Sequence, residues 1–589
     1  MNPTTSNPKY MKNIPLKRFL MGILFSFSAF NTFGQVPEIS GNRYDSIMEN
    51  SVNLCWQTAI QADSRVFWMV SDSNDQPVAY TDSIRIDSAV TAHSVFIGNL
   101  QPAVMYRYLV TSTAAGGSDS ATGFFITRSE STGKVTVWFN HSVDVSVNTG
   151  TRANGNTNFE KLLIEQISAA KHSIDITTWL FENEDTIATC LVNAKERGVK
   201  IRFVYNHTAD TPQIDTLKAH GIEVVKRNFE TNFTMHNKFW IFDHRYNTSP
   251  ANQYLWTGST NISHTQFHSD RNNIIIIQDQ SLCEVYTREF EEMWGSHTDQ
   301  PDIARSRFGT EKKGELAHIL NVAGTPIAVY FAPTDSIADS LVSLITAKSI
   351  KSIYFSMLKF VFPSIETTLH EAWLKGIQVS GVFDSSCSVL HGSAFPRMKG
   401  EHVAGTWQPP ADVFIDTLPG LIHHKYSLIN ADTTAGEKIV TTGSFNWELP
   451  AQEGNDENML VIHNATITNL YFQEFMARYH ESGGSQVGVS WGIAEDEPGT
   501  ALHKATCYPN PFSERTTVQF LLERRTPVKL EIYDSFGNRI AERDEGITDA
   551  GTRTVTIDGN KLPTGLLLCR IVAGGSARYL KLVHQGAAQ

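Results

Sequence analysis

The chain has 589 residues, too many for one hydrophobic core, so several domains are expected. Its composition, 41% apolar and 19% charged, is that of an ordinary globular protein and excludes a disordered or fibrous one. The net charge of −12 provides no attraction of the whole molecule to nucleic acid or an anionic membrane, although a local basic pocket is allowed. The six cysteines stand singly, without CxxC or metal-ligand spacing, so neither a cofactor nor a metal is predicted.

Residues 1–34 have the pattern of a targeting segment. A lysine- and arginine-containing start precedes the apolar run Phe19–Phe33, and the small-residue site Thr32-Phe33-Gly34 follows. The run is shorter than the roughly 20 residues that span a bilayer. We expect a cleaved export signal rather than a membrane anchor, and no transmembrane segment in the mature chain.

Residues 36–128 alternate as strands separated by polar breaks. Val52, Leu54 and Trp56 share one face, and Tyr106 begins a later strand after Leu100-Gln101-Pro102. That approach to Tyr106 is similar to the tyrosine corner of a β-sandwich. The segment resembles a fibronectin type III module, which would serve as a spacer, an adhesive module or a packing domain.

Residues 134–300 and 301–485 repeat one order of helices and strands. In the first copy, a helix starting near Phe159 precedes strands at 173–180 and 200–205, with a second helix between them. In the second copy, strands at 352–358 and 378–383 stand in the same order. EVYTREFEEMW at 284–294 returns as NLYFQEFMARY at 469–479, an offset of 185 residues. We therefore predict a duplicated α/β core with mixed sheets covered by helices.

Each copy carries the same polar motifs. MHNKFWIFD in the first copy corresponds to IHHKYSLIN in the second, and WTGSTN corresponds to TTGSFN. Residues i and i+2 of a strand share a face, so each His should point the same way as its Lys, and Asp243 should face away and support the structure. Two imidazoles, two ammonium groups, two amides and two hydroxyls would together form a pocket for a tetrahedral oxyanion. The predicted pocket residues are His236, Lys238, Ser259, Asn261, His423, Lys425, Ser444 and Asn446.

The doubled H-x-K-x4-D and G-S-x-N motifs resemble those of the phospholipase D superfamily, over roughly residues 134–480. The resemblance implies a metal-independent phosphodiesterase with a covalent phosphohistidine intermediate. One His attacks phosphorus, while the other protonates the leaving alcohol and then activates water or an acceptor alcohol. The lysines and asparagines would stabilise the phosphoryl oxygens.

The sequence departs from the family pattern at two positions. Asn430 replaces the motif aspartate of the second copy, which we expect to be tolerated. The carboxylate that orients each His in the family is Glu457 in the second copy, but Asn272 stands at the matching position of the first. We therefore expect Glu457 to support His423, and His236 to lack a carboxylate unless Asp270 reaches it. The choice of nucleophile stays open.

After a linker at 486–504, residues 505–589 read as a small β-sandwich. They contain YPNPF at 508–512, EIYDSFGNRI at 531–540 and LPTG at 562–565. These motifs resemble the C-terminal sorting domain of the type IX secretion system. The resemblance implies that the type IX machinery is a partner and that the protein is secreted or held at the cell surface.

The substrate is the least determined feature, because the superfamily cleaves phospholipids, cardiolipin or nucleic acid at the same chemical centre. We favour a phospholipid at a membrane surface, since export suits it and the acidic chain disfavours unsteered DNA binding. A secreted nuclease is the enzymatic alternative. A surface adhesin with an impaired core is supported only by Asn272 and Asn430, and a metal phosphatase by no ligand motif.

Overall fold

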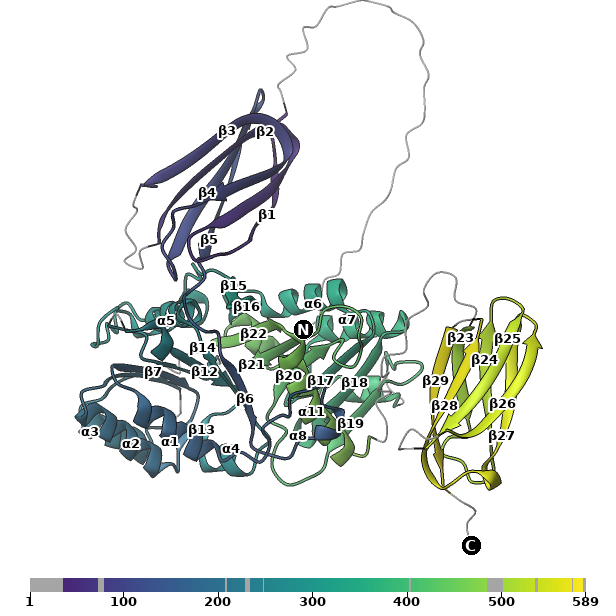
Figure 1. Ribbon diagram of the computed structural model, residues 1–589. Coiled ribbons are helices and arrows are strands. Elements are labelled where there is room, and N and C mark those ends of the chain that lie inside the picture. Colours follow the sequence, from purple (N-terminus) through teal and green to yellow (C-terminus); the bar gives the residue numbers. More distant parts are fainter. Residues whose placement is uncertain are drawn as a thin grey trace, which may run out of the picture.

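The computed structural model describes residues 35–71, 79–206, 209–227, 233–246, 248–401, 404–484, 502–534, 539–574 and 576–585. Figure 1 shows an N-terminal group of strands above a central α/β body, with the C-terminal strands to one side. The predicted export signal and most of the predicted linker lie outside the described residues. In the described part of the chain, no helix is long and apolar enough to cross a membrane.

The N-terminal strands form one antiparallel sheet in the order β1-β2-β4-β5, with β3 also paired to β2. They are β1 (Ile39–Asp45), β2 (Val52–Val70), β3 (Asp82–Ile97), β4 (Met105–Ala114) and β5 (Gly117–Ile126). Val52, Leu54 and Trp56 are buried together, as their alternation predicts. The Tyr106 hydroxyl accepts a hydrogen bond from the Gln101 backbone N–H at 2.9 Å, so this side chain fastens the loop before its own strand.

The sheet is docked on the core by polar contacts. Arg288 donates to both the hydroxyl and the carbonyl of Ser71, each at 3.0 Å. The Ile319 N–H donates to the hydroxyl of Tyr44 at 3.0 Å. Because Arg288 belongs to the first half of the core and Ile319 to the second, these contacts connect the sheet to both halves.

The first half of the core is a seven-stranded mixed sheet, in the order β10-β9-β7-β11-β12-β14-β6 among the described residues. β10, β9 and β7 are parallel, and the remaining pairs are antiparallel. Its strands are β6 (Val135–Phe139), β7 (Ser173–Thr178), β9 (Lys200–Tyr205), β10 (Glu223–Lys226), β11 (Phe239–Phe242), β12 (Tyr254–Gly258) and β14 (Asn273–Gln278). A separate short pair consists of β8 (Phe181–Glu182) and β13 (Ile262–Ser263). The helices are α1 (Phe159–Ala169), α2 (Asp185–Glu196), α3 (Pro212–Ala219), α4 (His264–His268) and α5 (Gln280–Trp294).

The second half repeats this plan with an eight-stranded sheet, β15-β16-β22-β21-β20-β17-β18-β19, in the described part of the chain. Its strands are β15 (Ile319–Val322), β16 (Thr325–Ala332), β17 (Ser352–Met357), β18 (Gln378–Asp384), β19 (Asp412–Asp416), β20 (Lys425–Ile429), β21 (Ile439–Gly443) and β22 (Glu457–His463). Its helices are α6 (Ile337–Lys348), α7 (Pro363–Leu374), α8 (Ser385–Ser388), α9 (Phe395–Lys399), α10 (Leu449–Glu453) and α11 (Ala465–Glu481). The helix and strand order predicted from the repeat is thus present in both halves.

The two halves share one apolar core. Helices α5 and α11 contribute Tyr286 and Tyr471, both fully buried, to a cluster that also contains strand residues of both sheets. Each helix also contacts the other half, α5 through β15 and α11 through β6. Apolar burial of this extent is the main force that holds the halves in one relative position.

The C-terminal segment forms two antiparallel sheets, β23-β24-β27 and β26-β25-β28-β29. Their strands are β23 (Leu502–Tyr508), β24 (Arg515–Leu522), β25 (Thr526–Tyr533), β26 (Arg539–Thr548), β27 (Gly551–Asp558), β28 (Gly565–Ala573) and β29 (Ser576–His584). Val518 from the first sheet and Leu530 from the second are buried in the same cluster. The sheets therefore enclose a small core of their own.

Candidate active site

The two H-x-K segments lie at matching places, immediately before β11 and at the start of β20. The prediction that His236 and Lys238 belong to a strand is wrong, because β11 begins only at Phe239; in the second half, β20 includes Lys425 but not His423. Instead, the side chain of each Lys hydrogen-bonds to the backbone of the His in its own motif. Lys238 Nζ donates to the His236 carbonyl at 2.8 Å, and Lys425 Nζ donates to the His423 carbonyl at 2.7 Å.

Two isolated bridges join the halves beside these motifs. Met235 pairs with Asp456, and Arg271 pairs with Ile422, both in parallel. The His236 N–H donates to the Asp456 carbonyl at 2.8 Å, and the His423 N–H donates to the Arg271 carbonyl at 3.0 Å. Each histidine is therefore placed opposite a polar residue at the start of the last sheet strand of the other half: Glu457 begins β22, and Asn272 immediately precedes β14.

This arrangement overturns the predicted partner of His423. Glu457 lies beside His236, with 2.8 Å between its Oε2 and the Nδ1 of His236. The hydroxyl of Ser444 donates to the same Oε2 at 2.5 Å, and the amide of Asn455 donates to Oε1 at 3.1 Å. The motif histidine of the first half therefore has a buried carboxylate, which the second half supplies.

His423 has the uncharged partner. Its Nδ1 lies 3.0 Å from the Oδ1 of Asn272, which also accepts from the hydroxyl of Ser259 at 2.8 Å. The amide nitrogen of Asn272 donates to the Gln266 carbonyl at 2.9 Å, which turns Oδ1 toward the imidazole. Asp270 does not replace a missing carboxylate at His236, since it accepts from the side chain of Gln266 and the backbone of Leu421.

Burial and positive charge dominate the electrostatics. Burial, followed by Lys238 and Lys425, holds the pKa of His236 well below its usual value, and burial and the same two lysines do this for His423. Burial also lowers the pKa of Lys238 to about 7 and that of Lys425 well below its usual value. Burial raises the pKa of Glu457 to about 7, against the opposing charge of Lys238. A site with this excess of buried donors and cations is arranged to receive an anion.

The G-S-x-N loops lie against the last sheet strand of their own half. A Cβ at Gly258 or Gly443 would come within 2.2 Å of the carbonyl oxygen of Asn273 or Asn458, so only glycine permits this approach. Asn261 and Asn446 are buried after these glycines, and neither side-chain carbonyl has a hydrogen-bond partner among the described residues. Two buried, incompletely paired amides are a feature of ligand sites.

The motif Asp243 lies outside this group and ties loops together. Its carboxylate accepts the backbone N–H groups of Lys171, His172 and Ser173 at 2.7–3.1 Å. Asn430 does the same in the second half, where its Oδ1 accepts from Ile350 and Lys351, both at 3.1 Å. An amide oxygen satisfies the same type of donor, so the second copy keeps this loop contact without the aspartate.

Three side chains that are not part of the motifs also border the site: Trp179, Lys359 and Glu448. Trp179 lies edge-on to His236, with ring centroids 6.1 Å apart. Lys359 Nζ is 3.3 Å from a carboxylate oxygen of Glu448, and its charge also lowers the pKa of both His236 and Lys425. Each lies one or two residues beyond a strand end or a motif asparagine, and that position is the signal that could have identified them.

Comparisons with known proteins match both halves of the core and the C-terminal segment. The family described as "Cardiolipin synthase, PLD-like domain" matches residues 163–294 and 341–479, and "Secretion system C-terminal sorting domain" matches residues 506–585. The mitochondrial cardiolipin hydrolase of Xenopus laevis is 28% identical over 160 residues, which are 27% of this chain and 69% of that protein. The phospholipase D of Rickettsia typhi is 30% identical over 131 residues, 22% of this chain and 57% of that protein.

Solved structures also align with parts of the chain. The polyphosphate kinase from Porphyromonas gingivalis aligns with a TM-score of 0.39 and 13% identity, over 58% of this chain and 50% of that one. The phospholipase D family member Nuc from Salmonella typhimurium aligns with a TM-score of 0.23 and 22% identity, over 26% of this chain and 94% of that one.

The two matched segments contain the two H-x-K and G-S-x-N motifs, and this match supports a phosphodiesterase hydrolase of the phospholipase D type. The chain contains a phospholipase D-like domain in two copies, followed by a sorting domain that marks it for secretion or for the cell surface.

Proposed function

We propose that this protein hydrolyses phospholipid phosphodiesters outside the cell through a phosphohistidine intermediate on His236. The observation that carries the proposal is the 2.8 Å contact between His236 Nδ1 and Glu457, made across the two halves beside a second imidazole and two lysines. Nδ1–H donates to the carboxylate, so the lone pair of Nε2 is free to attack phosphorus.

In the first step, Nε2 of His236 forms a bond to phosphorus and the bond to the leaving alcohol breaks. The phosphorylated imidazole carries positive charge, which Glu457 stabilises. His423 has a neutral partner, Asn272, and lies in a buried, positively charged site. Its protonated form is therefore a strong acid, suited to give a proton to the leaving alcohol.

In the second step, the neutral His423 takes a proton from water as the water oxygen attacks phosphorus. The N–P bond breaks, the phosphomonoester leaves, and His236 returns to its starting state. Lys238, Lys425, Asn261 and Asn446 would donate to the phosphoryl oxygens during both steps. Ser444 and Ser259 act by holding Glu457 and Asn272 in place.

Exposed apolar side chains in the segments next to the site residues in sequence support a phospholipid substrate. Leu418 is 40% exposed five residues before His423, and Leu449 is 46% exposed three residues after Asn446. Val389, 83% exposed, follows β18, whose last residue Asp384 accepts from the backbone of Ile422 at 2.8 Å. Apolar groups at the rim of a polar site suit contact with the acyl region of a membrane.

The test is hydrolysis by the full-length mature chain of phosphatidylcholine, cardiolipin, single- and double-stranded DNA and a chromogenic phosphodiester, with EDTA present. We expect lipid hydrolysis that is lost in His236→Ala and His423→Ala. Preferred hydrolysis of DNA would instead identify a secreted nuclease. No turnover of any diester would favour an adhesin with an inactive core.

A second experiment separates binding to a lipid surface from hydrolysis of the phosphodiester. Val389→Ser with Leu449→Ser should lower hydrolysis of vesicles several-fold and leave the soluble chromogenic diester unaffected. The control is Leu374→Ser, which removes a 65% exposed leucine that precedes β18 at its opposite end. Equal effects of both changes on vesicles would contradict the assignment of a lipid-facing rim.

The flanking parts fit an exported enzyme. We propose that the N-terminal sheet is a fibronectin type III-like spacer that sets the distance between the core and the surface. We also propose that the C-terminal sheets are read by the type IX secretion machinery.

A further inference from the structure

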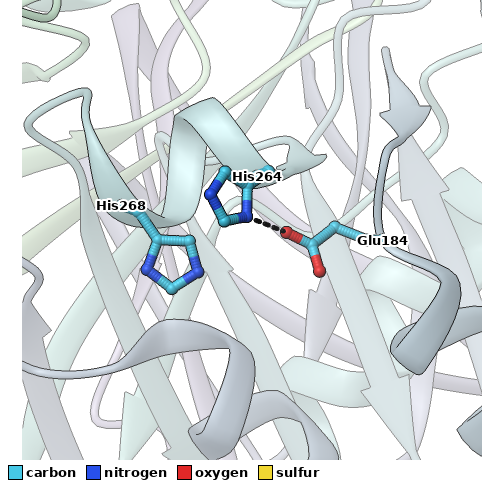
Figure 2. Close-up of side chains that lie close together, drawn as sticks. All are labelled: Glu184, His264 and His268. Atoms are coloured by element: carbon cyan, nitrogen blue, oxygen red, sulfur yellow. Dashed lines mark ion pairs between the residues drawn. The ribbon is translucent and has the colours of Figure 1, made fainter.

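Three side chains of types that can ligate a metal lie together outside the site formed by His236 and His423. His264 and His268 are four residues apart on α4 and therefore share one face of the helix. Glu184, at the start of α2, lies opposite them, with its Oε1 3.7 Å from the Nδ1 of His264. One ligand atom from each of the three side chains lies within 4.8 Å of the others, and Figure 2 shows their side chains gathered between α4 and α2.

Glu184 is buried without the contacts that a buried carboxylate needs. Its side chain is 4% exposed, and Oε1 has no hydrogen-bond partner among the described residues. Although Glu184 occupies the N-cap of α2, its side chain makes no capping hydrogen bond. Burial, with the nearby charges of Glu160 and Asp185, raises its pKa to about 7. A buried carboxylate oxygen that makes neither a capping hydrogen bond nor any other hydrogen bond indicates a missing partner.

We propose that Glu184, His264 and His268 bind a divalent transition-metal ion, for which Zn²⁺ is the best match. Two imidazoles and one carboxylate are a zinc ligand set, and a water would complete the tetrahedron. The side chains of His264 and His268 are 68% and 32% exposed, so they are free to rotate inward to the bonding distance of about 2.0–2.1 Å. Glu160, 3.7 Å from Nε2 of His268, is placed to orient that ligand.

The ion would affect the reaction by holding site residues in position, without contacting the substrate. Helix α4 carries Gln266, whose side chain accepts from the Asn261 N–H at 3.3 Å. The carbonyl of Gln266 accepts from Asn272, the partner of His423, at 2.9 Å. A metal that ties α4 to α2 would therefore stabilise the G-S-x-N loop of the first half and the acceptor behind His423.

In the described part of the second half, no equivalent set of ligands is present. Helix α10 stands where α4 does in the repeat, and Leu449 and Glu453 occupy the positions of His264 and His268. The phospholipase D-type chemistry, which uses both halves, therefore does not call for this ion. One ion per chain, not two, is expected.

Binding is tested with Co²⁺ and Zn²⁺ on the metal-stripped full-length mature chain. Co²⁺ should produce the intense visible absorption of a tetrahedral site with a stoichiometry of one, and Zn²⁺ should displace it. His264→Ala with His268→Ala should abolish the signal, and the conservative Glu184→Gln should weaken Co²⁺ binding at least tenfold. His172→Ala, which removes an exposed imidazole from the same half, should change nothing.

Two further measurements distinguish this site from binding at the paired histidines. His423→Ala should retain the Co²⁺ spectrum, because that change leaves α4 and α2 intact. Saturating Zn²⁺ should raise the Tm of wild type by on the order of 5 °C and not that of the double-alanine variant. An unchanged spectrum in the double variant, or loss of the spectrum in His423→Ala, would overturn the proposal.

Discussion

Replacing Glu457 by Gln tests the assignment of His236 as nucleophile. The change keeps the shape of the side chain but removes the charge that lies 2.8 Å from Nδ1 of His236. A hydrogen bond to a charged group contributes about 1.5–3 kcal/mol, and a tenfold rate change corresponds to about 1.4 kcal/mol. We therefore expect kcat on the chromogenic diester to fall roughly 10- to 100-fold.

The matched control is Asn272→Ala, which removes the neutral partner of His423 at 3.0 Å. A neutral hydrogen bond contributes only about 0.5–1.5 kcal/mol, so the loss should be about tenfold or less. The kcat of both variants is measured from nitrophenol release by stopped flow. A larger loss in Asn272→Ala than in Glu457→Gln would refute the argument, because it would assign the more critical imidazole to the second half.

Glu457→Gln should lower activity but raise the stability of the fold at high pH. Burial raises the pKa of Glu457 to about 7, so the folded state holds its proton more tightly than the unfolded chain does. The stability that this proton provides is complete below the unfolded pKa of about 4.3 and is lost as the pH rises through about 7. Glu457→Gln should therefore resist denaturant better than wild type at pH 8, with little difference at pH 4. A less stable variant at pH 8 would contradict the burial of an ionisable carboxyl.

Three other expectations follow from the structure. Lys425→Ala should lower kcat about 10²- to 10³-fold with the fold intact, since it removes a donor to the phosphoryl oxygens; an unchanged kcat would remove this lysine from the site. Asp243→Ala should destabilise the chain by about 3 kcal/mol, because buried N–H groups lose their acceptor, whereas Asn430→Asp should be nearly neutral in denaturant titration. Deleting residues 505–589 should retain the activity of purified protein but prevent its release from the cell, and normal delivery of the truncated chain would contradict the sorting assignment.

The repeat predicted much of the core, because periodicity and motif spacing are local properties. The strands predicted at 200–205 and 378–383 have the predicted positions, as β9 (Lys200–Tyr205) and β18 (Gln378–Asp384). The partner of each histidine was not predictable in this way. Sequence alignment pairs Glu457 with the motif of its own copy, whereas the bridge between Met235 and Asp456 brings it to the other copy. Contacts between duplicated halves depend on how their sheets meet, and a repeat does not specify this.

The proposed metal ligands were not predictable from the sequence for a related reason. His264 and His268 are separated by three residues in HTQFH, which is a weak signal by itself. The third side chain, Glu184, is 80 residues earlier and reaches the histidines only because β8 pairs with β13. Spacing rules detect ligands on one element, and here the decisive carboxylate belongs to another.

The most direct test of the central claim is to trap the intermediate in His423→Ala with bis(p-nitrophenyl) phosphate. Nitrophenolate leaves without a proton, so attack by His236 should proceed while the water step, which needs His423 as base, is blocked. We predict a burst of one equivalent of nitrophenolate and a nitrophenylphosphoryl group on His236, located by mass spectrometry of the quenched protein. Absence of a burst, or an adduct on His423 in the reciprocal His236→Ala variant, would contradict the account.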